Sequence, residues 1–154
     1  MSESDSPGVC LPPPLLFAAA VAAGLAIDRN MLDWAHVSRP AQFAGLAIAL
    51  AGLALILLSL GLFRRFRTRP EPWQPSSALI TSGLYRLSRN PMYLGMAATS
   101  AGVALYFESL AAAALLVIVV AVIDRFVIQR EERYLSRRFG TDYDAYRARV
   151  RRWL

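Results

Sequence analysis

The sequence predicts an all-α membrane protein, a single domain with four transmembrane helices, and three observations lead to this class. Of the 154 residues, 56% are hydrophobic, and the aliphatic ones are gathered into long blocks. The block 41–63 contains no charged residue and exceeds the roughly 20 residues that cross a bilayer. The basic residues, all of them arginine, flank these blocks. Such arginines favour anionic lipid headgroups over nucleic acid as partners.

The predicted spans are 9–27, 41–63, 91–107 and 110–128. At about 1.5 Å per residue, the first span is just long enough to cross the hydrocarbon core. A polar link, 28–40, separates it from the second span.

The spans also carry signals for how they pack. The second contains Gly45 and Gly52 among many alanines, and small residues of this kind let helices approach closely. The third and fourth are separated only by Glu108 and Ser109. So short a connection predicts an antiparallel hairpin.

The tail, residues 129–154, is expected to continue the fourth helix to Arg138 and to stop it at Gly140. Thr141 then caps a final short helix. We predict that this helix is amphipathic and lies on the headgroups, because large apolar residues recur at helical spacing among arginines. These residues are Tyr143, Tyr146, Val150 and Trp153.

The arginines predict the orientation in the membrane. The link 64–90 holds six and the chain from Arg125 onward holds nine, whereas the opposite side holds two, Arg29 and Arg39. By the positive-inside rule, both termini and the 64–90 link face the cytoplasm, which predicts a protein of the cell (inner) membrane. A single cysteine excludes an internal disulfide and a cysteine-rich zinc cluster, and no metal is expected.

Asn90 and Pro91 are the residue types favoured at the N-cap and the first position of a helix. The free N–H groups and partial positive charge at such a helix start suit a phosphate or a carboxylate. The alternative is that the two residues merely begin a membrane helix.

Glu131 is the second candidate. Its neighbours three and four residues away include no arginine, although arginines are abundant in this segment. A surface glutamate there would pair with one, so we expect Glu131 to face the bundle or the headgroup boundary. Asp124, seven residues earlier, falls on the same face. Such groups are candidates for function, the alternative being that they pair with arginines of the 64–90 link. Glu132 is expected to be solvated.

Two linked motifs carry a family resemblance. The first reads Gly-x-Tyr-x-x-x-Arg-Asn-Pro-x-Tyr-x-Gly and comprises Gly83, Tyr85, Arg89, Asn90, Pro91, Tyr93 and Gly95. The second follows the predicted hairpin and comprises Glu131, Glu132, Phe139, Gly140, Tyr143 and Tyr146. Over about half of the chain, this pattern resembles the isoprenylcysteine carboxyl methyltransferase and phospholipid methyltransferase superfamily of membrane enzymes. Asn90 stands where many relatives have His, and it cannot titrate as His does.

The resemblance implies an S-adenosylmethionine-dependent methyltransferase with a cytoplasmic cofactor site. In relatives the cofactor is held by the connection before the third span, by the Pro-containing helix start and by the glutamate after the fourth span. Glu131 is implied to accept from the cofactor and to take the catalytic role by positioning. The implied cofactor-binding residues are Leu79, Ile80, Gly83, Tyr85, Arg89, Asn90, Pro91, Tyr93 and Glu131.

The acceptor and two other functions stay open. The isoprenylcysteine enzymes have an arginine one turn before the glutamate, where this chain has Val127. A prenylcysteine carboxylate, a phospholipid amine or another lipophilic acceptor is therefore expected. The alternatives are an NADPH-dependent reductase of the sterol-reductase type and a non-catalytic membrane protein. No Gly-x-Gly-x-x-Gly turn is present, so a Rossmann-type cofactor site is not expected.

Overall fold

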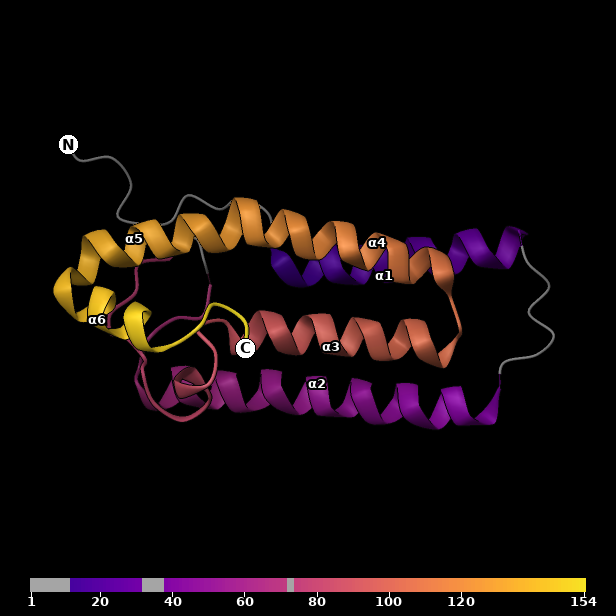
Figure 1. Ribbon diagram of the computed structural model, residues 1–154, viewed down its shortest axis with the longest axis horizontal. Coiled ribbons are helices and arrows are strands. Elements are labelled where there is room, and N and C mark those ends of the chain that lie inside the picture. Colours follow the sequence, from indigo (N-terminus) through magenta and orange to yellow (C-terminus); the bar gives the residue numbers. More distant parts are fainter. Residues whose placement is uncertain (1–11, 32–37, 72–73) are drawn as a thin grey trace.

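A computed structural model describes residues 12–31, 38–71 and 74–154, and in these ranges the chain is helical, without strands (Figure 1). The all-α prediction is confirmed for this part of the chain. The predicted start of the first span, residues 9–11, and residues 32–37 of the predicted 28–40 link lie outside it. The elements are α1 (Pro13–Met31), α2 (Arg39–Arg65), η1 (Gly83–Arg86), α3 (Pro91–Tyr106), α4 (Leu110–Val122), the π-helical η2 (Ile123–Ile128), α5 (Gln129–Phe139) and α6 (Thr141–Arg149).

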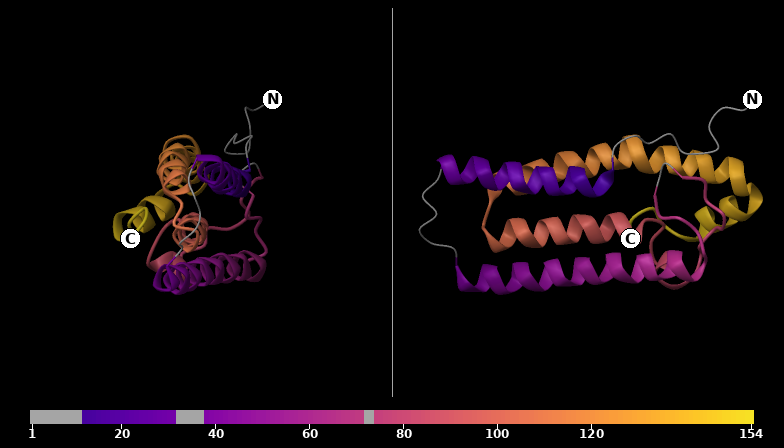
Figure 2. Two further views of the ribbon diagram at one scale, coloured as in Figure 1. Left: turned by 90° about the vertical axis from the view of Figure 1, so that its right-hand side faces the viewer. Right: turned by 180° about the vertical axis from the view of Figure 1, so that it is seen from behind.

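The long helices run side by side in two pairs (Figures 1 and 2). Helix α2 packs along α3, and α1 packs along α4, with α3 also touching the second pair. Helices α4, η2 and α5 form one continuous rod that extends past the N-terminal start of α3 (Figure 1). The rod therefore carries its last three turns beyond the apolar bundle, next to the link between α2 and α3.

Two helical segments are long and apolar enough to cross a membrane, Arg39–Arg65 and Leu110–Phe139. They expose large aliphatic side chains, as expected of surfaces that face lipid; Leu50, Leu57, Val117 and Ile118 are examples. Helix α1 has 19 residues and α3 has 16, so crossing by the first and third predicted spans stays a prediction.

Glycines bring α2 and α3 into backbone contact. A Cβ built on Gly52 lies 2.6 Å from the Gly95 carbonyl oxygen, and one on Gly45 lies 2.6 Å from the Gly102 carbonyl oxygen. Real side chains do not approach so closely, so both helices need glycine at these positions. The close packing predicted at Gly45 and Gly52 is confirmed.

The hairpin between α3 and α4 is also confirmed, and polar contacts close this end of the bundle. Ser109 caps α4 by accepting from the Ala112 N–H. The Asp28 carboxylate accepts from the Ser109 hydroxyl and from the Ala111 N–H. Asp28 is buried within α1, so its assignment to the polar link was wrong. The helix runs one turn longer because α4 supplies donors for this carboxylate.

We expect Gly52→Ala to lower the free energy of unfolding by about 1–3 kcal/mol, because its methyl group meets the α3 backbone. Gly61→Ala is the matched control, since a Cβ there meets nothing within 4 Å and alanine favours the helix. Thermal unfolding in detergent, followed by circular dichroism, measures both. Equal stability of the two variants would contradict this packing.

Candidate active site

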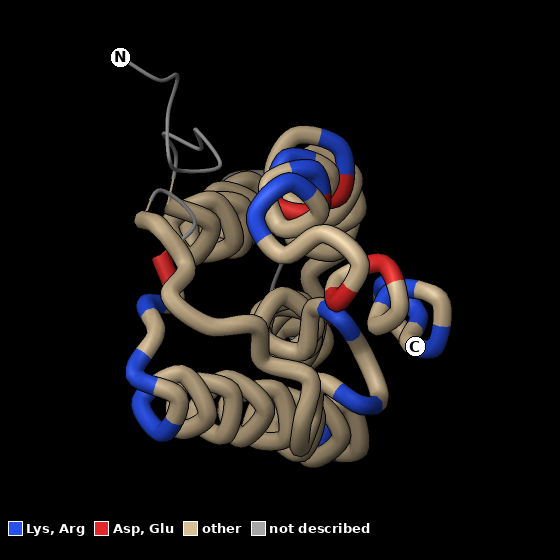
Figure 3. Tube along the Cα trace, turned by 90° about the vertical axis from the view of Figure 1, so that its left-hand side faces the viewer, with Lys and Arg blue, Asp and Glu red and all other residues tan. Residues whose placement is uncertain are grey.

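Three segments that are far apart in the sequence meet at one end of the bundle (Figure 3). They are the link after α2, the charged helix α5, and α6 with the chain that follows it. Arginines and acids gather at this end, as the end-on view shows. The two motifs that carry the family resemblance therefore meet at this end, as the implied cofactor site requires.

A pocket lies between these segments, with a cavity volume of about 110 Å³. Its walls come from α2, the link, the first turn of α3, α5 and α6. Among the lining residues are Leu79, Ile80, Tyr85, Arg89, Asn90, Tyr93 and Glu131, all of them predicted site residues, together with Arg69, Glu71, Gln74, Met92, Glu132, Tyr134, Tyr143 and Tyr146. Gly83 and Pro91 do not line it. Gly83 has φ +60 at the start of η1, and the buried Pro91 opens α3.

The carboxylate of Glu131 faces the first turn of α3. The Tyr93 hydroxyl donates to Glu131 Oε1 over 2.6 Å. The apolar part of the long rod ends at Ile128, so Glu131 lies beyond it in α5. Burial raises the pKa of Glu131 to about 7; the hydrogen bond from Tyr93 opposes this rise, and the charge of Glu132 adds to it. The expectation that Glu131 faces the bundle is confirmed.

A cluster of tyrosines forms the opposite wall. Tyr85, Tyr143 and Tyr146 pack with Ile80, and the Tyr146 hydroxyl donates to the Tyr85 carbonyl oxygen over 2.7 Å. Burial raises the pKa of Tyr85 and of Tyr146, so both hydroxyls stay neutral at physiological pH. The two motifs that carry the family resemblance are in contact here, the first through Tyr85 and the second through Tyr143 and Tyr146.

The prediction for α6 was wrong in one respect. Its aromatic face packs on the link rather than on headgroups, since Tyr143 and Tyr146 are buried. The helix ends at Arg149, and Val150 and Trp153 follow it in irregular chain. The regular spacing of large apolar residues predicts that one face of a helix is covered, but it does not identify the surface that covers this face. The helix stop predicted at Gly140 is confirmed by its φ of +53, and α6 begins directly after it, with Gly140 rather than Thr141 at the N-cap.

Asn90 occupies the predicted N-cap position, but its side chain does not cap α3. The Asn90 side-chain amide donates to the Arg152 carbonyl oxygen over 3.0 Å, beside a bond from the Ser88 hydroxyl to the same oxygen. Asn90 therefore fastens the C-terminal segment. The first-turn N–H groups of Met92 and Tyr93 have no acceptor among the described residues, which leaves the helix start free toward the pocket.

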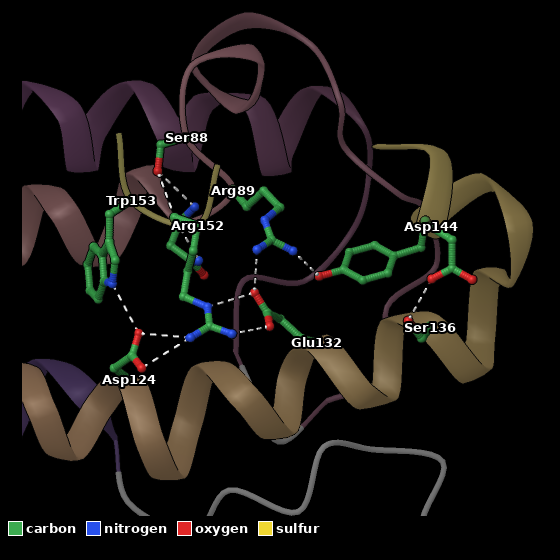
Figure 4. Close-up of polar contacts among 10 residues, drawn as sticks. Ser88, Arg89, Asp124, Glu132, Ser136, Asp144, Arg152 and Trp153 are labelled. Carbon is green, nitrogen blue, oxygen red and sulfur yellow. Dashed lines mark hydrogen bonds and ion pairs between the residues drawn. The ribbon is translucent and has the colours of Figure 1, made fainter. Parts of the chain in front are cut away.

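Glu132 is the centre of a partly buried charge network (Figure 4). Its side chain lies 3.1 Å from an Arg89 nitrogen and 2.7 Å from an Arg152 nitrogen. Arg152 also pairs with Asp124 at 3.2 Å, whose carboxylate accepts from the Trp153 indole. The expectation that Glu132 is solvated was wrong, because it is the most enclosed acid of the tail.

The π-helical turn of η2 explains why the helical spacing misplaced these acids. In a regular α-helix, residues seven apart differ by about 20° and residues eight apart by about 80°. The π turn holds one extra residue, so Asp124 shares its face with Glu132 and not with Glu131. Both carboxylates consequently reach Arg152. Asp124 thus pairs with an arginine of the tail, not of the 64–90 link. Residue spacing along the sequence does not reveal a π turn.

One further pocket residue, Glu71, was missed by the sequence reasoning. Glu71 Oε2 and Arg89 Nε are buried side-chain atoms without a hydrogen-bond partner in the part of the chain that the structure describes. Both residues line the pocket. Buried polar groups are rarely left unpaired, so the pocket offers one free acidic and one free basic atom. For Glu71, only its place in a long polar link marked it.

The fold and site define a helical membrane protein whose charged, tyrosine-lined pocket lies beyond its apolar helices. The phospholipid methyltransferase family model matches residues 40–142, and the chain belongs to that family. The family implies a membrane methyltransferase, and its members generally use S-adenosylmethionine. The recognised resemblance is confirmed.

The chain is also similar to an uncharacterized protein of Haemophilus influenzae, with 50% identity over 38 residues. That match covers 25% of this chain and 60% of the relative. No solved structure matches the chain significantly.

Glu132→Gln is expected to lower the free energy of unfolding by roughly 2–4 kcal/mol, because it leaves two arginines without their shared charge. Asp142→Asn removes an exposed charge from the neighbouring helix and is expected to change stability by less than about 0.5 kcal/mol. Denaturation in detergent compares the two. An equal, small effect would mean that the network does not hold the tail.

Proposed function

We propose that the protein is an S-adenosylmethionine-dependent methyltransferase of the inner membrane that acts on a lipophilic acceptor. The observation that carries the proposal is the Glu131 carboxylate, held by Tyr93 and facing a pocket at the start of α3. A carboxylate there suits an ammonium or a sulfonium, and the free helix start suits a carboxylate. S-adenosylmethionine, the methyl donor, carries an ammonium, a sulfonium and a carboxylate.

The charges of the pocket fit such a ligand. The unpartnered Arg89 Nε is a donor for a carboxylate, and the unpartnered Glu71 Oε2 is an acceptor for an ammonium or a hydroxyl. The uncapped N–H groups of Met92 and Tyr93 add two donors. A zwitterion would satisfy groups of both signs, whereas a simple anion or cation would leave one set unpaired.

The size of the cavity requires its walls to adapt. Its volume of about 110 Å³ is below the roughly 300 Å³ of a typical small-molecule site. Arg69 and Gln74, two long side chains, line it and hydrogen-bond to each other in an exposed position. Because an exposed hydrogen bond contributes little, a ligand of nucleoside size displaces this pair at small cost.

S-adenosylmethionine, when bound, supplies a methyl group activated by its sulfonium. The part of this chain is to bind, orient and exclude water. The rings of Tyr85 and Tyr93 offer aromatic faces for a cation, and Glu131 orients an amino group or a ribose hydroxyl. A general base is needed only when the acceptor arrives protonated, so Glu131 is a positioning residue in this proposal.

The pocket favours a phospholipid amine over a prenylcysteine carboxylate as acceptor. Val127 stands where the isoprenylcysteine enzymes have arginine, and it is buried in the apolar core. The two neighbouring arginines do not replace it: Arg125 is exposed and donates to Gln129, and Arg130 is exposed and does not line the pocket. An anionic acceptor thus lacks a cation at that position.

We further propose four spans with both termini and the 64–90 link in the cytoplasm. The arginine distribution supports this orientation, and the pocket then opens to cytosolic cofactor. The single domain would thus place acceptor and donor on the same side of the membrane.

Calorimetry in detergent is expected to show saturable binding of S-adenosylmethionine. Glu131→Gln and Tyr93→Phe should each weaken it by about 10- to 100-fold, the effect of losing a hydrogen bond to a charged group. Asp142→Asn, on the exposed face of α6, should leave it unchanged. Binding of NADPH instead would favour the reductase, and binding of neither would favour the non-catalytic protein.

The pH dependence follows from the pKa of Glu131, about 7. Affinity for S-adenosylmethionine should rise from pH 6 to pH 8, because the ionised carboxylate attracts the cation. As the pH rises from about 4.5 to 7, the free energy of unfolding of the ligand-free protein should fall, because the folded state holds this proton more tightly than the unfolded chain does. Glu131→Gln should flatten both curves; an unchanged affinity profile would remove Glu131 from the site.

A further inference from the structure

A second recess lies on the outer side of α5 and α6, separate from the pocket described above. It has a volume of about 420 Å³ and is lined by Gln129, Glu132, Arg133, Ser136, Arg137, Arg147 and Arg152. Four arginines thus surround one carboxylate, and that carboxylate, Glu132, is already shared between Arg152 and Arg89. The recess carries a clear excess of positive charge.

Three of the four arginines of this recess have no acid to pair with in the described part of the chain. Arg133, Arg137 and Arg147 are exposed, and no described residue forms a hydrogen bond or an ion pair with any of them. Asp144, on the neighbouring helix α6, accepts from Ser136 instead. Guanidinium groups that converge without a counter-charge repel one another, so this site is ready for an anion.

The position of the recess indicates which anion it takes. Helix α5 begins directly after Ile128, the last residue of the apolar rod. Phe126 at the end of that rod is 57% exposed and Leu154 is 71% exposed, as expected near lipid. The recess therefore lies at headgroup depth, where phosphate is the abundant anion. Arginine binds phosphate with paired hydrogen bonds.

We propose that this recess is a binding site for the phosphate group of an anionic phospholipid, coupled to the pocket through Arg152, Glu132 and Arg89. Glu132 lines both cavities. An anion that engages Arg152 from outside weakens its pull on Glu132 and strengthens the pairing of Glu132 with Arg89. Because the Arg152 carbonyl oxygen also holds Asn90 and Ser88, occupancy of the recess reaches the start of α3.

Trp153 provides a reporter, since its indole donates to Asp124, the other partner of Arg152. In a variant that carries Trp34→Phe and Trp73→Phe, Trp153 is the one tryptophan that remains of the three. The protein in neutral detergent is titrated with dihexanoylphosphatidic acid, with dihexanoylphosphatidylcholine and with glycerol 3-phosphate. Saturable change of Trp153 emission is expected with the phosphatidic acid and not with phosphatidylcholine, whose ammonium offsets its phosphate.

The variant Arg133→Gln/Arg137→Gln/Arg147→Gln should weaken the binding of phosphatidic acid at least about tenfold, through the loss of charged hydrogen bonds. The control variant Arg86→Gln/Arg149→Gln/Arg151→Gln removes the same charge outside the recess. Its affinity for phosphatidic acid should stay within about twofold of that of the unchanged protein. Circular dichroism shows that both variants are folded; if the first is not, Arg147→Gln alone replaces it.

The outcomes separate the sources of the phosphate. Binding of glycerol 3-phosphate with the same loss in the recess variant shows that the phosphate group suffices, and binding of phosphatidic acid alone shows that lipid is required. Equal weakening in both variants, or no saturable change with either phosphate compound, overturns the proposal. Neither result depends on methyl transfer, so the proposal and the enzymatic activity can fail separately.

Discussion

The geometry of the end of the bundle that holds the pocket depends on one buried carboxylate that is shared by two arginines. Glu132 joins Arg89 of the link to Arg152 of the C-terminal segment, and it does so from α5. A buried charge must be compensated where it lies, so these three segments hold fixed positions relative to one another. The link and α5 both line the pocket, so the spacing of these two walls follows from this pairing.

Adjacent glutamates thereby take opposite tasks. Glu132 is satisfied by two cations, whereas the protein contact of Glu131 is a neutral tyrosine hydroxyl. A group with its charge already balanced holds structure, and one with its charge unbalanced is available to a ligand. The two unpartnered atoms on Glu71 and Arg89 extend this contrast around the cavity. The pocket is held by paired charges and lined with unpaired ones.

The sequence predicted what depends on length, apolarity and small residues: the helices, the hairpin at Glu108 and the close contact at Gly52. It also placed Glu131 correctly, because an acid without nearby arginines must face inward. It misplaced Asp124 and Glu132, since helical spacing assumes a regular helix and a π turn intervenes. The role of Asn90 could not be read locally, because its partner is a carbonyl oxygen 62 residues away.

The most direct test of the site is to locate the methyl donor on the chain. Purified protein is irradiated with labelled S-adenosylmethionine, digested with trypsin and mapped, with excess unlabelled compound as the competition control. The pocket predicts competed label in the peptides 68–86 and 90–125, which carry Tyr85 and the start of α3. Label confined to other peptides, or label that unlabelled compound does not displace, would contradict a cofactor site between α3 and α5.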